Sequence, residues 1–251
     1  MTRLQAVFWD VDGTLADTEM EGHRPAFNAA FADLGLPFVW DEFLYAELLT
    51  IPGGMRRVER YAVEAGRPLS QEELIQIRDR KRIHYRRLAR EGGIRPRPGV
   101  LRLVQALDQQ GVDQWIVTSS GRASVEALFD GVPELNRFIR GTISADDVPH
   151  GKPAPDGYLL ALQHSGHRPT RVMAIEDSEA GLLAARAAGL NCLLTPSPWD
   201  RGVLAGGRPE AVAVFDHLGD EGHPVQQFAG PSCADPWVTV EYLSSLLPRT
   251  E

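Results

Sequence analysis

Residues 7–17 read VFWDVDGTLAD and lie almost at the start of a chain of 251 residues. An apolar run leads into Asp10, and a second carboxylate follows at Asp12 before Gly13. Residues two apart in a strand face the same side, so these carboxylates repel each other and lose water if the strand is buried. The stretch therefore predicts a buried strand ending in a tight turn, where the acidic pair has a positive partner or a chemical role.

The composition is ordinary for a soluble globular protein, with 43% hydrophobic and 24% charged residues. A net charge of −8 argues against a nucleic-acid partner. The apolar runs are too short to span a bilayer, and the N-terminal residues lack the apolar segment of a signal peptide. The two cysteines, Cys192 and Cys233, indicate no disulfide framework. We expect a cytoplasmic monomer with no membrane partner.

Short apolar runs alternate with helical patterns through much of the chain. Strands are predicted over residues 5–9, 115–117, 141–144, 171–175, 191–194 and 211–215. Helices are predicted over residues 21–34, 71–90, 100–110, 121–129, 155–162 and 179–188. This alternation predicts an α/β fold, with a Rossmann-like parallel sheet covered by helices on both faces.

Residues 17–92 interrupt the alternation, because they contain helical patterns and no convincing strand. We interpret them as a helical cap domain inserted after the first strand, with the core formed by residues 1–16 and 93–251. Residues 92–99 are rich in Gly and Pro and suggest a hinge. Residues 195–236 are also rich in Gly and Pro, and we expect mostly loop there, around the strand at 211–215.

Polar side chains follow three of the predicted strands. Thr118 and Ser119 come after the second strand, and Glu176 and Asp177 come after the fourth. Lys152 lies between them, in the loop sequence GKPAP. Open α/β sheets bind ligands at the carboxyl edge of their strands, so we expect these groups to meet Asp10 and Asp12 there.

This set of residues suits phosphoryl transfer. Carboxylates are the hard oxygen ligands that Mg²⁺ prefers, and a bound cation would offset the repulsion between Asp10 and Asp12. A lysine and a hydroxyl group can hold phosphate oxygens. One aspartate can then attack phosphorus, while the other moves the proton.

The residues resemble the four motifs of the haloacid dehalogenase superfamily of phosphohydrolases: DVDGT at 10–14, Thr118, Lys152 in GKPAPD, and the acidic pair in AIEDSEAG. The resemblance implies that Asp10 is the nucleophile and Asp12 the general acid/base. It implies that Thr118, Ser119 and Lys152 bind the phosphoryl group. Mg²⁺ would be held by Asp10, Glu176, Asp177 and the backbone carbonyl of Asp12.

The cap segments 16–36 and 48–61 are similar to the CbbY group of this superfamily. That resemblance implies a phosphorylated sugar as substrate, namely xylulose 1,5-bisphosphate, an inhibitor of the Calvin-cycle enzyme Rubisco. The cap residues expected to bind it are Glu19, His23, Arg24, Arg56 and Arg57. The sequence departs from the group at Met55, where lysine is usual. Alternative activities are a β-phosphoglucomutase-like mutase and a phosphatase for phosphoglycolate or another small sugar phosphate. A non-catalytic binding protein is disfavoured, because all four motifs are intact.

Several of these residues also have structural interpretations. Thr118 and Ser119 could cap the following helix, and Glu176 could act as an acidic helix cap. A lone histidine such as His23 is commonly a packing residue. The basic run at residues 78–90 is interpreted as a solvated helix face, with attraction of an anionic substrate or an acidic partner as the alternative.

Overall fold

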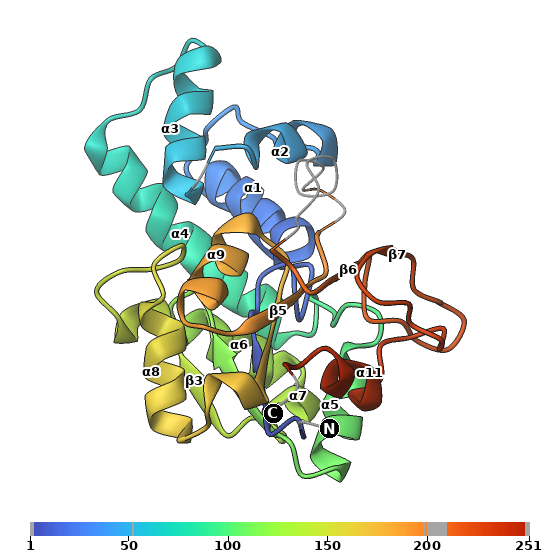
Figure 1. The fold of residues 1–251 in the computed structure, drawn as a ribbon. Coiled ribbons are helices and arrows are strands. Elements are labelled where there is room, and N and C mark those ends of the chain that lie inside the picture. The colour runs from blue at the N-terminus through green and yellow to red at the C-terminus, as the bar shows by residue number, and fades with distance from the viewer. Residues whose placement is uncertain (1–2, 52, 198, 200–209, 249–251) are drawn as a thin grey trace.

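One sheet of seven strands runs through the computed structural model, which describes residues 3–51, 53–197, 199 and 210–248 (Figure 1). The strand order is β3-β2-β1-β4-β5-β6-β7, and all neighbouring pairs are parallel except β6 and β7. The strands are β1 (Ala6–Trp9), β2 (Asp113–Val117), β3 (Gly141–Ile143), β4 (Val172–Glu176), β5 (Asn191–Leu194), β6 (Ala213–Phe215) and β7 (Gln227–Ala229). The predicted α/β fold with a parallel sheet is confirmed.

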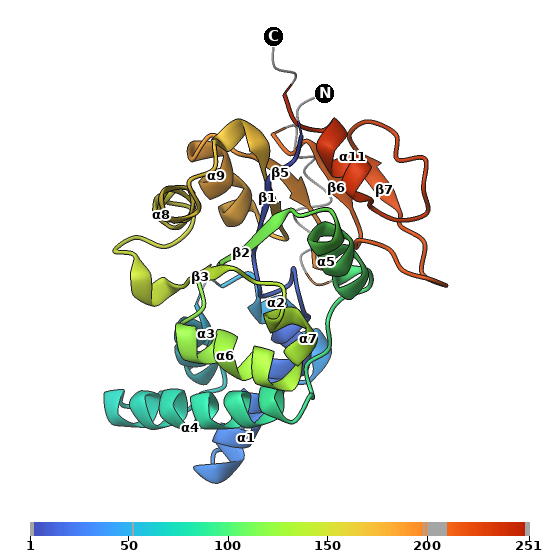
Figure 2. The same ribbon diagram turned by 90° about the horizontal axis from the view of Figure 1, so that it is seen from below.

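Helices cover both faces of the sheet (Figure 2). Val7 and Trp9 of β1 pack with α5 (Val100–Gln109), α6 (Arg122–Gly131), α7 (Pro133–Asn136) and α11 (Val240–Ser245). Ala6 and Phe8 face the other way, toward α8 (Asp156–Ser165) and α9 (Glu179–Ala187). Two short 3₁₀ turns lie at Ala145–Asp147 and Pro169–Arg171. Burial on both faces explains why β1 is continuously apolar.

The region between β1 and α5 is helical, and its described residues from 17 to 92 contain no strand. Its elements are a π-helical segment (Thr18–His23), α1 (Arg24–Asp33), α2 (Glu42–Leu48), α3 (Gly54–Glu64) and α4 (Gln71–Arg90). They enclose their own apolar cluster, which includes Phe31 and Trp40. Figure 1 shows this region above the sheet. The division into two domains at residues 16 and 93 stays a prediction.

The last turns of α4 also pack on the sheet-containing part. Tyr85 and Ala89 belong to the same apolar cluster as β1, and Arg90 forms an ion pair with Asp130 of α6 at 3.0 Å. The cap helices are thus anchored at α4 as well as at their two chain connections.

None of the helices in the described residues is long and apolar enough to span a membrane.

Three details differ from the sequence predictions. The first cap helix begins at Thr18 with π-helical geometry, and Pro25, which lacks an N–H, lies where α1 takes over. The predicted loop at 195–236 lies partly outside the described residues, and its described part contains β7 in addition to β6. Helix α11 was not predicted. β7 and α11 are short, so their sequence periodicity is weak.

Candidate active site

The carboxyl ends of β1 and β4 meet at a buried lysine. The Asp10 backbone N–H donates to the Ile175 carbonyl at 3.0 Å, which joins the two strand ends. Lys152 Nζ lies 2.5 Å from Asp10 Oδ1 and 2.5 Å from Glu176 Oε1. All three side chains are almost completely removed from solvent. The positive partner expected for the acidic strand end is therefore Lys152, from a loop 142 residues away.

These buried charges shift one another's pKa values. Burial, followed by the neighbouring carboxylates, raises the pKa of Asp10 to about 7, although Lys152 opposes the shift. Burial opposes the charge on Lys152, but Asp10 and Glu176 outweigh it and raise the pKa of the ammonium group. Lys152 is thus positively charged at neutral pH, whereas its surroundings disfavour the ionised form of Asp10.

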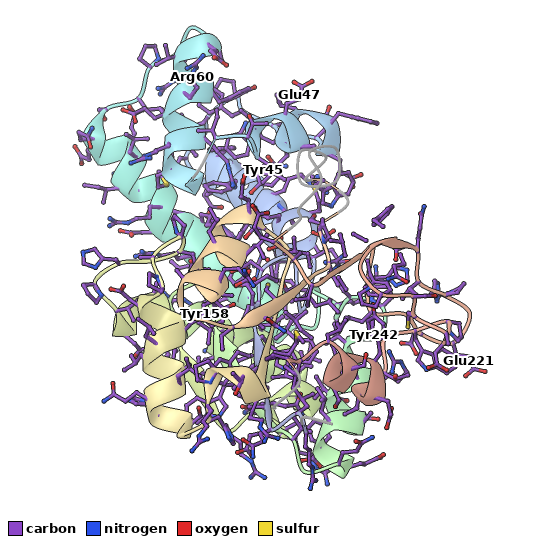
Figure 3. The ribbon with its side chains drawn as sticks, viewed as in Figure 1. Tyr45, Glu47, Arg60, Tyr158, Glu221 and Tyr242 are labelled. Carbon is purple, nitrogen blue, oxygen red and sulfur yellow. The ribbon has the colours of Figure 1, made fainter. Side chains whose placement is uncertain are left out.

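Asp10, Glu176 and Asp177 form an acidic cluster, in which one oxygen from each lies within 4.8 Å of the others. Glu176 is fully buried, with Oε1 accepting a hydrogen bond from the Tyr158 hydroxyl group, which comes from α8 (Figure 3). Its Oε2 has no hydrogen-bond partner among the described residues. A cluster of three carboxylates, in which buried Glu176 keeps one oxygen without a hydrogen bond, fits a hard divalent cation such as Mg²⁺.

Burial also raises the pKa of Asp177 well above its ordinary value, and the charges of Asp10 and Glu176 add to that effect. A cation bound among these carboxylates would favour their ionised forms. The carboxylate of Asp12 is outside the cluster that could hold a metal.

The carboxylate of Asp12 is held by hydroxyl groups instead. Thr18 Oγ1 donates to Asp12 Oδ1 at 2.5 Å, and Ser120 Oγ donates to Asp12 Oδ2 at 2.5 Å. His23 Nε2 lies 3.7 Å from Asp12 Oδ1. Thr18 and His23 both belong to the π-helical segment of the cap, whereas Ser120 follows β2 in the core. Asp12 therefore lies where the core and the cap meet.

Gly13 makes the turn that separates the two aspartates from the cap. Its φ is +82°, and a Cβ there would lie 2.1 Å from Asp177 Oδ2. Its N–H donates to the Ala16 carbonyl at 2.8 Å, closing the turn. Only glycine combines this backbone conformation with so close an approach of the Asp177 carboxylate.

Lys81 lies in the basic run of α4, which we interpreted as a solvated face, but it is half-buried and faces the site. Its Nζ lies 3.0 Å from His23 Nδ1 and over the rings of Phe27 and Tyr85, at 5.3 Å and 5.1 Å from their centroids. For this residue the interpretation is wrong. The composition contained a signal that Lys81 differs from its basic neighbours. Lys81 and Lys152 are the only lysines of the chain, and all its other Lys/Arg residues are arginines.

Burial depresses the pKa of both members of this pair. It lowers the pKa of His23 to about 3, with the Lys81 charge as the next cause. Burial also lowers the pKa of Lys81 to about 8, while Glu19 and Asp12 oppose the shift. At neutral pH the pair is therefore a neutral imidazole beside an ammonium group.

Glu19 is the centre of a second network in the cap. Tyr45 Oη donates to Glu19 Oε2 at 2.6 Å, and Arg57 Nη1 lies 3.3 Å from the same oxygen. Arg57 is buried, and its Nε donates to the Ile51 carbonyl at 2.9 Å. The charges of Glu19 and Arg57 both act on Lys81, which places this network beside the His23–Lys81 pair.

The other predicted site residues are more peripheral. Arg24 forms an ion pair with Glu42 of α2 at 3.2 Å. Arg56 and Ser119 are exposed, with no side-chain hydrogen bond or ion pair to other described residues. Thr118 is buried, and its Oγ1 accepts from the Ser120 N–H at 3.0 Å.

Besides Lys81, four residues around the site were not among the predicted site residues. They are Thr18, Tyr45, Ser120 and Tyr158. Each donates through a hydroxyl group to a predicted acidic residue. Single hydroxyl-bearing residues carry no pattern in a sequence, so this pairing could not be read from spacing.

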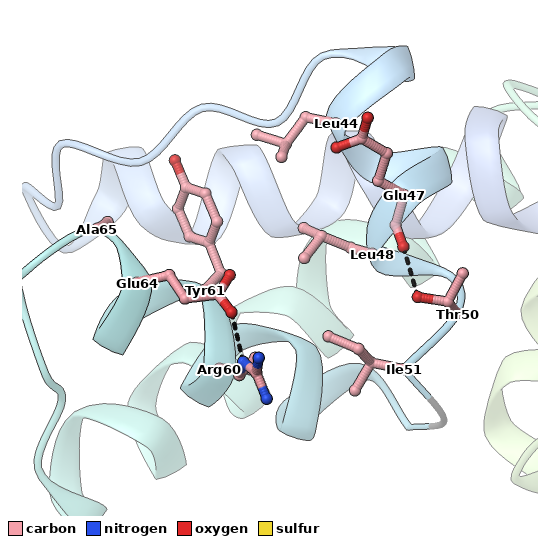
Figure 4. A pocket seen from close by; sticks show the side chains of 9 residues that line it. All are labelled: Leu44, Glu47, Leu48, Thr50, Ile51, Arg60, Tyr61, Glu64 and Ala65. Atoms are coloured by element: carbon pink, nitrogen blue, oxygen red, sulfur yellow. Dashed lines mark hydrogen bonds and ion pairs between the residues drawn. The ribbon is translucent and has the colours of Figure 1, made fainter.

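A separate cavity of about 530 Å³ lies between α2 and α3 (Figure 4). The residues that line it are Leu44, Glu47, Leu48, Thr50, Ile51, Arg60, Tyr61, Glu64 and Ala65. It contains none of the predicted site residues, and two of its three charged groups, Arg60 and Glu64, pair with each other. This cavity is therefore not the candidate active site.

The chain is similar to known proteins in both sequence and structure. A family model described as haloacid dehalogenase-like hydrolase matches residues 4–189. The chain is 38% identical over 248 residues to the CbbY protein of Cupriavidus necator, covering 96% of this chain and 95% of the relative.

Two solved structures of CbbY from Rhodobacter sphaeroides are also similar. One, in complex with phosphate, has 34% identity and a TM-score of 0.75, covering 87% of this chain and 96% of that one. The other, a mutant in complex with xylulose 1,5-bisphosphate, has 34% identity and a TM-score of 0.73, covering 85% and 94%. The chain therefore belongs to the haloacid dehalogenase-like hydrolases and is a phosphatase of their CbbY-like group.

Proposed function

We propose that this protein is a Mg²⁺-dependent sugar-bisphosphate phosphatase that acts through an aspartyl-phosphate at Asp10, with xylulose 1,5-bisphosphate as its substrate. The observation that carries the proposal is the buried carboxylate of Asp10, placed between Lys152 and the Glu176–Asp177 pair. The substrate is supported by the similarity to the CbbY structure that contains this sugar bisphosphate.

Mg²⁺ would be held by the carboxylates of Asp10, Glu176 and Asp177, and we propose the backbone carbonyl of Asp12 as a further ligand. When bound, the cation supplies positive charge for the phosphate oxygens. The unpartnered Oε2 of Glu176 supports this assignment.

Asp10 is the proposed nucleophile. Its Oδ1 is next to the Lys152 ammonium group, which leaves Oδ2 to attack the phosphorus atom. The phosphorus–oxygen ester bond then breaks, its electron pair passes to the sugar oxygen, and Asp12 supplies the proton to that oxygen. In the second half, Asp12 takes a proton from water, whose oxygen attacks phosphorus and releases phosphate and Asp10.

The phosphoryl group would be bound by Lys152, Thr118 and Ser119. Thr118 Oγ1 already accepts a backbone hydrogen bond, so its own hydrogen can be donated to a phosphate oxygen. The ammonium group of Lys152 is held by two carboxylates and can interact with a phosphoryl group on Asp10.

The cap would bind the rest of the sugar phosphate. Glu19, His23 and Arg24 lie on the π-helical segment and the start of α1, and His23 faces Asp12. For the distal phosphate we propose Arg56 and Arg57. Met55 packs against the cap's apolar cluster, whereas Arg56 is exposed and can supply the charge that lysine provides in the CbbY group.

The test is a phosphate-release panel at saturating Mg²⁺. Xylulose 1,5-bisphosphate is compared with ribulose 1,5-bisphosphate, fructose 1,6-bisphosphate, phosphoglycolate and glucose 1-phosphate. We expect the first to have the highest kcat/KM; equal values for all five would contradict a dedicated role. Conversion of glucose 1-phosphate to an isomer without phosphate release would indicate a mutase.

Asp10→Asn tests the nucleophile. It should lower kcat by about 10⁴-fold while the protein stays folded, because the amide cannot form the aspartyl-phosphate. Asp156→Asn is the matched control, since Asp156 is half-buried, pairs with the exposed His150 at 2.9 Å and lies outside the acidic cluster.

A further inference from the structure

Arg97 is a buried arginine on the second connection between the cap and the core. Its side chain lies next to the turn at Gly13, and the residue is 8% exposed. Its backbone N–H donates to the Leu15 carbonyl at 2.9 Å, and Ala16 and Pro96 form an antiparallel bridge. The two connections to the cap are thus paired with each other at this point.

The guanidinium group joins three loops that follow strands. Nη1 donates to the carbonyl of Gly13 after β1 and to that of Thr195 after β5, the latter at 2.5 Å. Nη2 donates to the carbonyls of Pro196 at 3.1 Å and of Asp216, after β6, at 2.6 Å. One planar group with several donors in a rigid fork can hold these carbonyls in a fixed arrangement.

The charge of Arg97 is unusually placed. Among the described residues, its side chain donates hydrogen bonds to carbonyl and hydroxyl oxygens but to no carboxylate. Burial lowers the pKa of its guanidinium group. The carboxylates of Asp177, Asp17 and Asp216, in that order, offset the effect of burial. A buried cation without an ion pair is costly, so its retention calls for a positional or electrostatic role at the neighbouring acidic site.

One of the carbonyls that Arg97 binds, that of Gly13, belongs to a closely packed turn. Gly13 directly follows Asp12, and its Cα faces the Asp177 carboxylate so closely that a Cβ would lie 2.1 Å from Oδ2. A shift of Gly13 therefore changes both the position of Asp12 and the space around Asp177. Without the guanidinium group, the Gly13 and Thr195 carbonyls would have to find other donors.

We propose that Arg97 is a positioning residue, which fixes the Gly13 turn against Asp177 and so sets the geometry of the acidic cluster for a divalent cation. This inference rests on the proposed function, because it takes the acidic cluster to be a Mg²⁺ site. It assigns Arg97 no contact with substrate. Its effect passes through the Gly13 carbonyl.

The test compares Arg97→Lys and Arg97→Met with Arg102→Lys and Arg102→Met. Arg102 of α5 is a matched control, because its guanidinium group also donates to carbonyls, those of Leu218, Gly219 and Val238. Burial lowers its pKa as well. Mg²⁺ binding to the metal-free proteins is measured by calorimetry, together with kcat, KM and thermal unfolding.

We expect both Arg97 variants to bind Mg²⁺ about tenfold or more weakly, and kcat to fall with little change in KM. Arg97→Lys, which keeps the charge and fewer donors, should stay folded at the assay temperature. Both Arg102 variants should lose stability and keep wild-type Mg²⁺ affinity.

Three results with the variants would overturn the proposal. One is a wild-type Mg²⁺ affinity in Arg97→Lys. Another is an equal loss of Mg²⁺ affinity in the Arg102 variants, which would indicate a general loss of stability as the cause. The third is tighter Mg²⁺ binding in Arg97→Met, since that would mean that Arg97 acts only as a repulsive charge. The calorimetric Mg²⁺ affinities test the role of Arg97 even if the wild-type protein hydrolyses no phosphate ester. That absence of hydrolysis would reject only the proposed function. A wild-type protein that does not bind Mg²⁺ rejects both.

Discussion

Lys81 Nζ lies 3.0 Å from Nδ1 of His23, and the opposite nitrogen of that imidazole faces Asp12. An ammonium group can only donate, so Nδ1 accepts, and the neutral ring carries its hydrogen on Nε2, toward the Asp12 carboxylate. The distance of 3.7 Å from Nε2 to Asp12 Oδ1 is too long for a hydrogen bond, so the interaction there is electrostatic. Lys81 thus sets the tautomer of the residue that faces the proposed general acid/base.

The first prediction concerns pH. Because the pKa of Lys81 is lowered to about 8, its ammonium group is lost as pH rises through that value, and with it the attraction for an anionic substrate. The kcat/KM for a sugar bisphosphate should therefore fall above pH 8. Lys81→Arg, which stays charged, should move this fall to higher pH, and Lys81→Met should lower kcat/KM about tenfold at pH 7.

The measurement is a profile of kcat/KM from pH 6 to pH 10. Arg78→Met is the control, because Arg78 lies on the same helix but is paired with Asp79 at 3.0 Å. The same alkaline limb in wild-type protein and Lys81→Arg would show that another group titrates.

The second prediction concerns the turn. Gly13→Ala should destabilise the fold by about 2–5 kcal/mol, because the left-handed backbone is strained and the new methyl group meets Asp177. Gly111→Ala separates the two causes, since Gly111 has a φ of +70° but no atom within 4 Å of the added Cβ. It should cost about 1–2 kcal/mol. Urea unfolding of both variants measures the difference, and equal losses would mean that the contact with Asp177 contributes nothing.

The third prediction concerns the hydroxyl group that binds Asp12. Ser120→Ala removes the 2.5 Å hydrogen bond to Asp12 Oδ2 and should lower kcat about tenfold, with the fold intact. Single-turnover kinetics would locate the loss in proton transfer to the leaving group. Ser124→Ala, on α6, is the control. An unchanged kcat in Ser120→Ala would mean that Thr18 alone orients the Asp12 carboxylate.

The fourth prediction concerns the cap network. Tyr45→Phe deletes the donor to Glu19 and leaves the Glu19–Arg57 ion pair, so Glu19 should become less well oriented. We expect KM for the sugar bisphosphate to rise about tenfold, with a smaller change in kcat. Tyr61→Phe is the control, because Tyr61 lies in the same aromatic cluster of the cap and packs on Trp40. A similar rise in KM for both variants would place the effect in cap packing instead.

Much of the fold could be predicted because its signals are local. The continuous apolar run of β1 indicates burial on both faces, and Gly13 after two carboxylates indicates a sharp turn at the sheet edge. In a parallel sheet the carboxyl ends of the strands lie along one edge. Lys152, in a loop at that edge, therefore comes close to Asp10 and Glu176. The register confirms the neighbouring strands, since Trp9 pairs with both Ile116 and Ile175.

By itself, therefore, the sequence determined the α/β architecture, which follows from hydrophobic periodicity, and predicted the group of residues at its carboxyl edge from the polar residues that follow the strands. The tertiary structure alone decided which cation on α4 turns inward and which arginine binds the carbonyl of the Gly13 turn. Lys81 and Arg97 sit among other basic residues, and their neighbours in the chain do not distinguish them. Their roles depend on how α4 packs against α1 and α6, and on which carbonyls the loops after β5 and β6 leave without donors.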